Sequence, residues 1–166
     1  MPCRGAFFAL SATQAEHLLA LARDEDRLAY VQDGIEATWD EAHLLQTDKA
    51  WDAIHRCLTD GTLTIARSEE PLGKLIAGGS QLYADTQNYI LNLIHAGELG
   101  AVSEALKEVT RDWMKARYEQ LAGTDYPQEL ISDLDWEYMW GWFSRIPGFV
   151  DQAQREGRSI LFTVDQ

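Results

Sequence analysis

The sequence predicts an α+β fold in which a small sheet contains both ends of the chain and several helices pack against it. Short apolar segments near the termini, residues 5–10 and 159–164, have the composition of buried strands. Segments in which apolar residues recur at helical spacing occupy much of the chain between them. A chain of 166 residues has the length of one domain. We therefore expect a single domain over residues 1–166, with both terminal strands in one sheet.

The first third of the chain contains one clear helix signal. The strand at 5–10 is followed by Ser11, and Gln14 stands three residues later, which is the arrangement of a capping box. The apolar face of the helix that follows consists of Ala15, Leu18, Leu19 and Ala22. The acidic residues 24–26 predict the end of this helix or the start of a loop. Residues 31–43 predict a loop that contains a short helix.

A second helix is predicted over residues 48–59. Thr47 precedes it as an N-cap, and Asp48 falls in the first turn, where the helix dipole favours negative charge. Gly61 suits the left-handed turn that often ends a helix. The apolar stripe of this helix consists of Ala50, Trp51, Ile54, Cys57 and Leu58. We expect the stripe to pack on the sheet.

The middle of the chain gives weaker signals. Residues 63–66 and 71–77 predict short strands, the second of which ends in a tight turn at Gly78 and Gly79. Residues 89–94 are apolar and could form a strand, but their periodicity does not decide.

The last third of the chain is predicted to be mainly helical. Residues 102–121 have helical spacing, and Thr110 can cap a second helix inside this segment. Residues 129–155 are also helical, and Pro147 either kinks this helix or begins a new one. Gly157 ends the segment before the final strand.

The chain is strongly acidic, because 27 acidic residues stand against 14 basic ones and give a net charge of −13. A surface of this sign repels phosphate backbones and anionic lipids, so we expect neither nucleic-acid binding nor membrane binding. It attracts basic proteins, or it only confers solubility. The apolar runs are too short for a membrane span or a signal peptide. These features are typical of a cytoplasmic bacterial protein.

One histidine stands out as a candidate site. On a helical wheel His55 falls at the edge of the apolar stripe beside Trp51, and Asp48 and Asp52 lie just beyond it. A carboxylate near an imidazole orients the ring and favours its charged form, which suits a general base or a binding histidine. The alternative is a boundary histidine with a structural role. The candidate site therefore consists of Asp48, Trp51, Asp52 and His55.

The sequence indicates no metal site and no cofactor. The histidines show none of the spacings of metal ligands, and Cys3 and Cys57 form neither a disulfide framework nor a zinc motif. Phosphate-binding glycine motifs and the nucleophile motif of hydrolases do not occur in the chain.

A second candidate surface lies in the aromatic segment 133–143. Trp136, Trp140 and Phe143 share one helical face, which predicts a core stripe with an acidic, solvated face opposite. The alternative is an interface for a basic protein, since aromatic residues anchor interfaces and acidic rims accelerate encounter with basic partners. The candidate interface residues are Asp133, Asp135, Glu137, Tyr138 and Trp142.

Several of these motifs occur together in one known family. They are Asp48-Lys49-Ala50-Trp51, His55, Leu58-Thr59 with Gly61, and Pro71-Leu72 with Gly78-Gly79. In these segments and in its terminal strands the chain resembles the YfbM-like (DUF1877) family of bacterial proteins of unknown function. The family often carries a second histidine directly after the tryptophan, where this chain has Asp52. The resemblance implies an α+β fold and implies no established activity.

Two classes of function remain open from the sequence. The first is a non-enzymatic binding or interaction module, which the charge of −13 extends to an antitoxin-like or immunity-like role against a basic protein. The alternative is a small hydrolase or other enzyme centred on His55 with Asp48 and Asp52.

Overall fold

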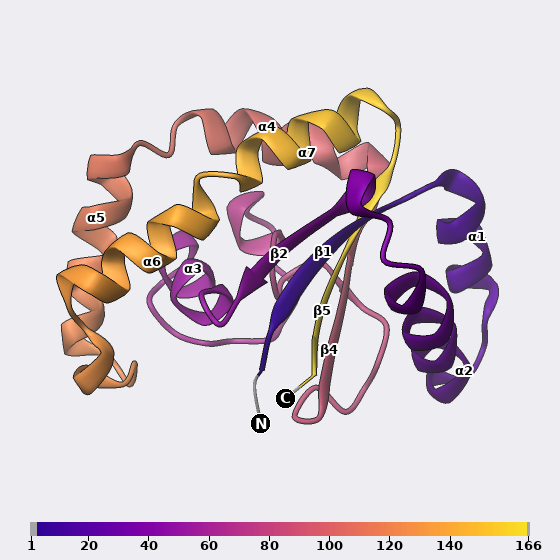
Figure 1. The fold of residues 1–166 in the computed structure, drawn as a ribbon, viewed down its shortest axis with the longest axis horizontal. Coiled ribbons are helices and arrows are strands. Elements are labelled where there is room, and N and C mark those ends of the chain that lie inside the picture. Colours follow the sequence, from indigo (N-terminus) through magenta and orange to yellow (C-terminus); the bar gives the residue numbers. More distant parts are fainter. Residues whose placement is uncertain (1–2, 166) are drawn as a thin grey trace.

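Five strands form one antiparallel sheet in the order β2-β1-β5-β4-β3, as the computed structural model of residues 3–165 shows (Figure 1). The strands are β1 (Gly5–Leu10), β2 (Leu44–Asp48), β3 (Ser80–Gln81), β4 (Tyr89–Ile94) and β5 (Ser159–Asp165). The helices are α1 (Ala12–Ala20), α2 (Asp24–Tyr30), α3 (Trp51–Leu58), α4 (Leu99–Lys107), α5 (Arg111–Gln120), α6 (Asp133–Phe143) and α7 (Ile146–Arg155). The α+β fold class predicted from the sequence is confirmed.

The two terminal strands are neighbours, as predicted. β1 pairs with β5 along its whole length, so that Phe7 lies opposite Phe162. Both rings are fully buried and their centroids are 4.7 Å apart. This pairing ties both ends of the described chain into the centre of the sheet (Figure 1).

Both faces of the sheet are covered, each by a different set of helices. Side chains alternate along each strand, so Phe7 and Ala9 of β1 point to one face and Phe8 and Leu10 to the other. Helices α3 to α7 contribute to the larger core on the first face. Helix α1, together with the π-helical segment Val31–Glu36, covers the second face, to the right in Figure 1.

The helix boundaries predicted from capping residues are mostly confirmed. The Ser11 hydroxyl accepts from the Gln14 amide at 3.2 Å, and the Gln14 side chain accepts from the Ser11 amide at 2.9 Å. Thr110 caps α5, which separates it from α4. Pro147 lies in the first turn of α7 and so begins a new helix. Gly157 ends that segment with φ +67°.

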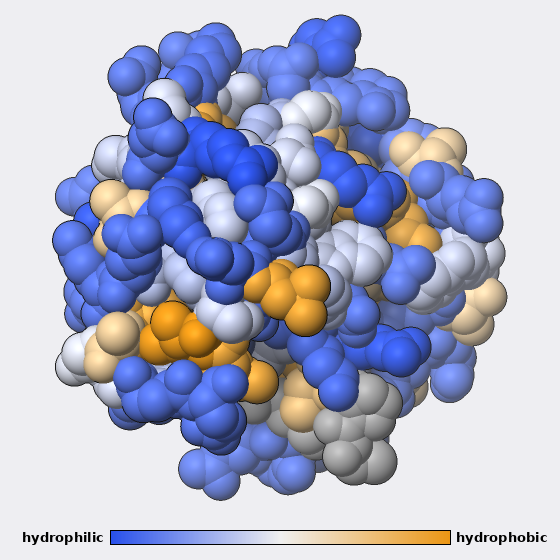
Figure 2. Space-filling view, turned by 60° about the vertical axis from the view of Figure 1, so that its left-hand side comes forward, coloured by the Kyte–Doolittle hydropathy of each residue, from blue (hydrophilic) through white to orange (hydrophobic). Residues whose placement is uncertain are grey.

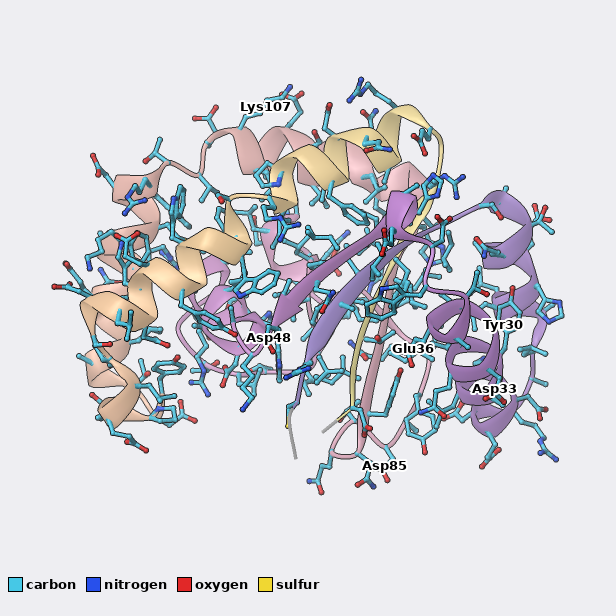
Figure 3. The ribbon with its side chains drawn as sticks, viewed as in Figure 1. Tyr30, Asp33, Glu36, Asp48, Asp85 and Lys107 are labelled. Carbon is cyan, nitrogen blue, oxygen red and sulfur yellow. The ribbon has the colours of Figure 1, made fainter. Side chains whose placement is uncertain are left out.

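The prediction that residues 24–26 end a helix or open a loop is wrong. The short helix expected within residues 31–43 is present as the 3-10 helix Glu41–His43, but a π-helical segment, Val31–Glu36, precedes it in place of a loop. Asp24 to Asp26 form the first turn of α2, where acidic residues are favourable, and do not end a helix. The π-helical segment then brings Glu36 to the sheet, where its carboxylate accepts from the hydroxyls of Tyr89 at 2.5 Å and Thr163 at 2.7 Å (Figure 3).

The predicted start of the helix at 48–59 is also wrong. Residues 44–48 form β2, and α3 begins at Trp51. Thr47 is buried in the strand, and Asp48 adopts φ +48° where the strand ends. Pairing with β1 places Asp48 opposite Gly5, and this tertiary contact outweighs the local helix signal.

Residues 63–66 and 71–77 are not strands. They belong to an irregular segment between Thr59 and Gly79, and this segment contains only the short 3-10 helix Leu72–Lys74. Strand β3 begins at Ser80, after the predicted glycine turn. The segment 89–94, which the sequence left undecided, is the fully buried strand β4.

Candidate functional site

A cavity lies beside His55, between α3 and the irregular segment that follows it. It has a volume of about 680 Å³, which is within the range of ~300–1,000 Å³ typical of small-molecule sites. Helix α3 supplies one wall, the irregular segment between Thr59 and Gly73 supplies a second, and α4 and α5 contribute Ala105 and Arg117. The lining residues include His55, Leu58, Asp60, Ala66, Arg67, Glu70, Pro71, Leu72, Ala105 and Arg117.

The pocket wall is a long loop that is fixed in place. The Ser68 amide donates to the carbonyl oxygen of Gly78 at 2.8 Å, and the Ser68 hydroxyl brackets Glu70 by bonds of 3.1 Å to its amide and its carbonyl. Gly73 packs directly against Ser68, since a Cβ atom at Gly73 would lie 2.3 Å from the Ser68 hydroxyl oxygen. An ordered loop of this length without regular structure is uncommon unless it serves a site.

Arg117 closes the base of this loop. Its Nε atom donates to the carbonyl oxygen of Cys57 at 2.5 Å, and its Nη2 atom donates to that of Thr59. The guanidinium carbon lies 4.9 Å from the ring centroid of Trp113. The Thr59 hydroxyl in turn donates to the His55 carbonyl oxygen at 2.8 Å. Arg117 therefore fixes the end of α3 to α5 at the edge of the pocket.

His55 is buried and lines the pocket with only 3% of its surface exposed. Its Nε2 atom lies 3.2 Å from the carbonyl oxygen of Thr64, so Nε2 carries the proton and donates. The Nδ1 atom is buried without a hydrogen-bond partner among residues 3–165. Burial lowers the pKa of His55, although the Thr64 carbonyl and the charge of Asp52 act in the opposite direction. The ring is therefore neutral at physiological pH.

The two carboxylates of the candidate site are engaged by arginines. The Asp52 carboxylate accepts from Nε of Arg56 at 2.6 Å, and the Asp48 carboxylate lies 3.2 Å from Nε of Arg4. Asp48 stands where β2 leads into α3 (Figure 3). The hydrogen bond that orients the His55 ring is donated to the loop carbonyl of Thr64, and not to Asp48 or Asp52.

Trp51 belongs to the core. Only 5% of its surface is exposed, its indole N–H donates to the carbonyl oxygen of Cys3 at 2.9 Å, and its ring lies 6.4 Å from that of Phe162 on the sheet. The predicted packing of α3 on the sheet through Trp51, Ile54 and Leu58 is confirmed.

Arg56 is a buried cation that the sequence analysis missed. Its side chain is 5% exposed and donates to Asp52 at 2.6 Å, to Asp125 at 2.5 Å and to the Gly61 carbonyl oxygen at 3.2 Å. Burial disfavours its charge, but the bonds to Asp125 and Asp52 raise the pKa of Arg56 overall. Asp52 stands four residues before Arg56, a pairing signal that was available in the sequence, whereas Asp125 is brought near only by the fold.

The structure divides the candidate interface residues into two groups. Asp135 accepts hydrogen bonds from the hydroxyls of Tyr118 at 2.5 Å and Tyr126 at 3.2 Å. Its carboxylate therefore binds buried residues of the fold and is not available to a partner. The side chains of Asp133 and Glu137 are exposed but pair with Lys115 and Arg111 of α5. The surface of α6 is therefore not wholly negative, because two of its acids are paired with basic side chains of α5.

The aromatic members of the candidate interface lie near β2. Tyr138 is 38% exposed, its hydroxyl accepts from the Lys49 amide at 3.2 Å, and its ring meets Trp142 edge to face at 6.4 Å. Leu134, one turn earlier on α6, is 83% exposed. Figure 2, which brings the α5 and α6 side forward, shows separate apolar patches on a mainly hydrophilic surface.

Two kinds of feature are absent from residues 3–165. Within that range no group of three or more histidine, cysteine, aspartate or glutamate side chains is arranged to hold a metal ion. No described helix is both long enough and apolar enough to cross a membrane.

Replacing His55 by Gln is expected to lower the free energy of unfolding by about 1–2 kcal/mol at neutral pH, because the bond to Thr64 weakens. The variant should also lose part of the pH dependence. The pKa of His55 is lowered from 6.5 in the folded protein, so the unfolded chain binds the proton first and the parent loses stability as the pH falls through 6.5. Urea unfolding of both proteins across this range measures the difference.

The exposed residue His17 provides the control for this pH series. His17→Gln makes the same chemical change at that exposed position and so reports the effect of the substitution itself. Superimposable curves for the parent and His55→Gln would show that His55 is not a buried neutral histidine.

Comparisons with known proteins address the family. The model of the family DUF1877, a domain of unknown function, matches residues 1–163. The crystal structure of YfbM from Escherichia coli, itself a protein of unknown function, is similar with a TM-score of 0.66 and 19% sequence identity. The match covers 97% of this chain and 99% of that one, and at this identity it shows a shared fold. No curated protein matches the chain. The chain belongs to the DUF1877 family, because the model of that family matches nearly the whole chain, residues 1–163.

Proposed function

We propose that this protein is a non-enzymatic binding module whose ligand occupies the pocket beside His55. The observation that carries the proposal is the cavity of about 680 Å³ walled by the fixed loop between Thr59 and Gly73. A loop of this length is costly to order, because each fixed residue loses about 1–2 kcal/mol of conformational entropy. The hydrogen bonds within the loop fix the wall of the cavity, as expected of a largely preformed binding site.

The polar groups around the pocket support binding over catalysis. The His55 ring donates to the Thr64 carbonyl, and no bond from the ring to Asp48 or Asp52 is formed among residues 3–165, so the carboxylate–histidine pair of the hydrolase hypothesis is not assembled. The nearby Cys57 is a poor nucleophile, since burial raises its pKa to about 12. The Ser68 hydroxyl is used in bonds to Glu70.

The pocket can be blocked from α4. Ala105 lines it, so Ala105→Phe should fill part of the cavity while keeping a helix-compatible residue. Ala101, one turn earlier on the same helix, is exposed and does not line the pocket, so Ala101→Phe is a matched control. Native mass spectrometry of protein purified from its own host should show a small-molecule adduct on the parent and on Ala101→Phe. Ala105→Phe should lack the adduct. Equal occupancy of all three proteins would contradict the proposal.

A second function is favoured by the charge of −13, namely an antitoxin-like or immunity-like interaction with a basic protein. The exposed Leu134 and Tyr138 lie on α6 beside the exposed acids Asp133 and Glu137, and together they offer an apolar contact with an acidic rim. Asp135 cannot be part of the test, because its bonds to Tyr118 and Tyr126 stabilise the fold.

Association with a basic partner should slow as the salt concentration rises and should slow further in the variant Asp133→Lys/Glu137→Lys. The control is Glu104→Lys/Glu108→Lys, which makes the same charge change at exposed positions of α4 and its C-terminal end. Stopped-flow association rates measure the difference. Equal rates for the two double variants would remove α6 as the interface.

The alternative function is a small hydrolase centred on His55 with Asp48 and Asp52. It predicts turnover of ester or phosphoester substrates that both His55→Gln and Asp52→Asn abolish. The binding proposal predicts the same background rate for the parent and both variants. The arginine partners of Asp48 and Asp52 support the second outcome.

A further inference from the structure

We infer that the pocket binds a small amphipathic anion. Such a ligand has an apolar body and one carboxylate or similar oxyanion, and the oxyanion pairs with Arg67. This inference rests on the proposed binding function and adds the chemical class of the ligand. It combines three observations, which are the apolar lining of the cavity, the free donors of Arg67, and the engagement of the other charged groups.

The apolar part of the ligand is indicated by the walls. The lining side chains without polar atoms come from α3, the loop and α4, and they are Leu58, Ala66, Pro71, Leu72 and Ala105. The buried His55 beside them is neutral and adds no charge to this part of the pocket. Transfer of an apolar group from water to such a surface is favourable.

Arg67 is the cation of the pocket whose N–H donors are the least engaged. Its contacts are long, 3.5 Å from Nη1 to the Ser80 hydroxyl and 3.8 Å from Nη2 to the Glu98 carboxylate. Glu98 already accepts from the Lys74 ammonium at 2.9 Å, so its charge is largely compensated. The Arg67 side chain is 58% exposed and can turn toward a ligand. A guanidinium with free N–H groups matches a carboxylate in bidentate geometry.

The remaining charged groups of the pocket are less available. The Nε and Nη2 atoms of Arg117 donate to the carbonyl oxygens of Cys57 and Thr59. Asp60 accepts from the amide and the hydroxyl of Thr62 at 3.0 and 2.7 Å, which lowers its pKa and keeps it ionised. Glu70 is exposed and opposes an anion, so Glu70→Gln should tighten anion binding. Because the whole chain carries −13, an anion has no general attraction to this protein and needs a specific cation.

Two related dyes separate the apolar and anionic contributions. Anilinonaphthalene sulfonate carries the negative charge, and phenylnaphthylamine has a similar aromatic body without it. Both fluoresce more strongly in apolar sites, so titration gives their dissociation constants. We expect the full-length parent to bind both dyes and Ala105→Phe to weaken both, while Ala101→Phe leaves both unchanged.

The arginine is tested by Arg67→Gln, with Arg23→Gln as the control. Arg23 is 69% exposed and lies outside the pocket. Arg67→Gln should raise the dissociation constant of the sulfonate dye about tenfold, as expected for a lost charge-assisted bond. The dissociation constant of the neutral dye should not change. Arg23→Gln should change neither. If Ala105→Phe blocks both dyes but Arg67→Gln leaves the sulfonate unaffected, the anion inference is overturned and the pocket stands. If neither dye binds the parent, the pocket proposal and this inference both fail.

Discussion

A Trp51→Ala variant unfolds with about 3–5 kcal/mol less free energy than the parent, as large-to-small changes of buried aromatic residues do. Trp51 is 5% exposed, its indole N–H bonds to the Cys3 carbonyl, and its ring packs toward Phe162 at the centre of the sheet. Urea denaturation monitored by circular dichroism measures the loss. Leu134→Ala is the control, because Leu134 is 83% exposed and its loss should cost less than about 0.5 kcal/mol. Equal stabilities of the two variants would contradict the packing of α3 described here.

Arg56→Met is expected to have the second largest effect, a loss of about 2–3 kcal/mol, because bonds to charged partners are removed from a buried site. The change keeps much of the side-chain volume but removes the donors to Asp52, Asp125 and Gly61. The Asp125 side chain is 75% exposed and water can solvate it, which limits the cost.

Asp125→Asn provides the comparison for Arg56→Met. It removes one exposed charge and leaves the bond between Arg56 and Asp52, so its effect should be smaller. The Arg56 guanidinium lowers the pKa of Asp125, so this contribution is present at neutral pH and is lost as the pH falls through the lowered pKa. Equal losses in the two variants would show that Arg56 acts through Asp125 alone.

The parts of the fold that were predictable are those in which local signals agree with the tertiary structure. The two terminal strands are continuous apolar segments, and both are buried on both faces, so composition alone identified them. Ser11 and Thr110 were identified as caps because their side chains satisfy free amides of the same helix. These interactions involve residues within a few positions of one another.

The errors occur where distant contacts decide the structure. Thr47 and Asp48 look like the start of a helix, but pairing with β1 places them in a strand. The segment 63–77 contains apolar residues, but it pairs with no strand of the sheet. Its hydrogen bonds between backbone groups are formed within the loop and with Gly78. Local periodicity does not report which partner the backbone finds.

The candidate site was only partly predictable for the same reason. His55 could be identified as a boundary residue from the helical wheel, but its partner Thr64 and the cavity beside it depend on the path of the loop. On α6 the acids were visible in the sequence, whereas Arg111 and Lys115 neutralise two of them from another helix. Charge patterns along a sequence therefore overstate the charge of a folded surface.

The pocket beside His55 is tested most directly by a crystal structure of the protein with anilinonaphthalene sulfonate bound. Density for the naphthalene body is expected between the loop at Leu72 and Ala105 of α4. The sulfonate oxygens should lie within about 4 Å of the Arg67 guanidinium, the usual limit for an ion pair. Density for the dye on another surface, with the pocket beside His55 empty, would contradict the proposal that this pocket is the binding site.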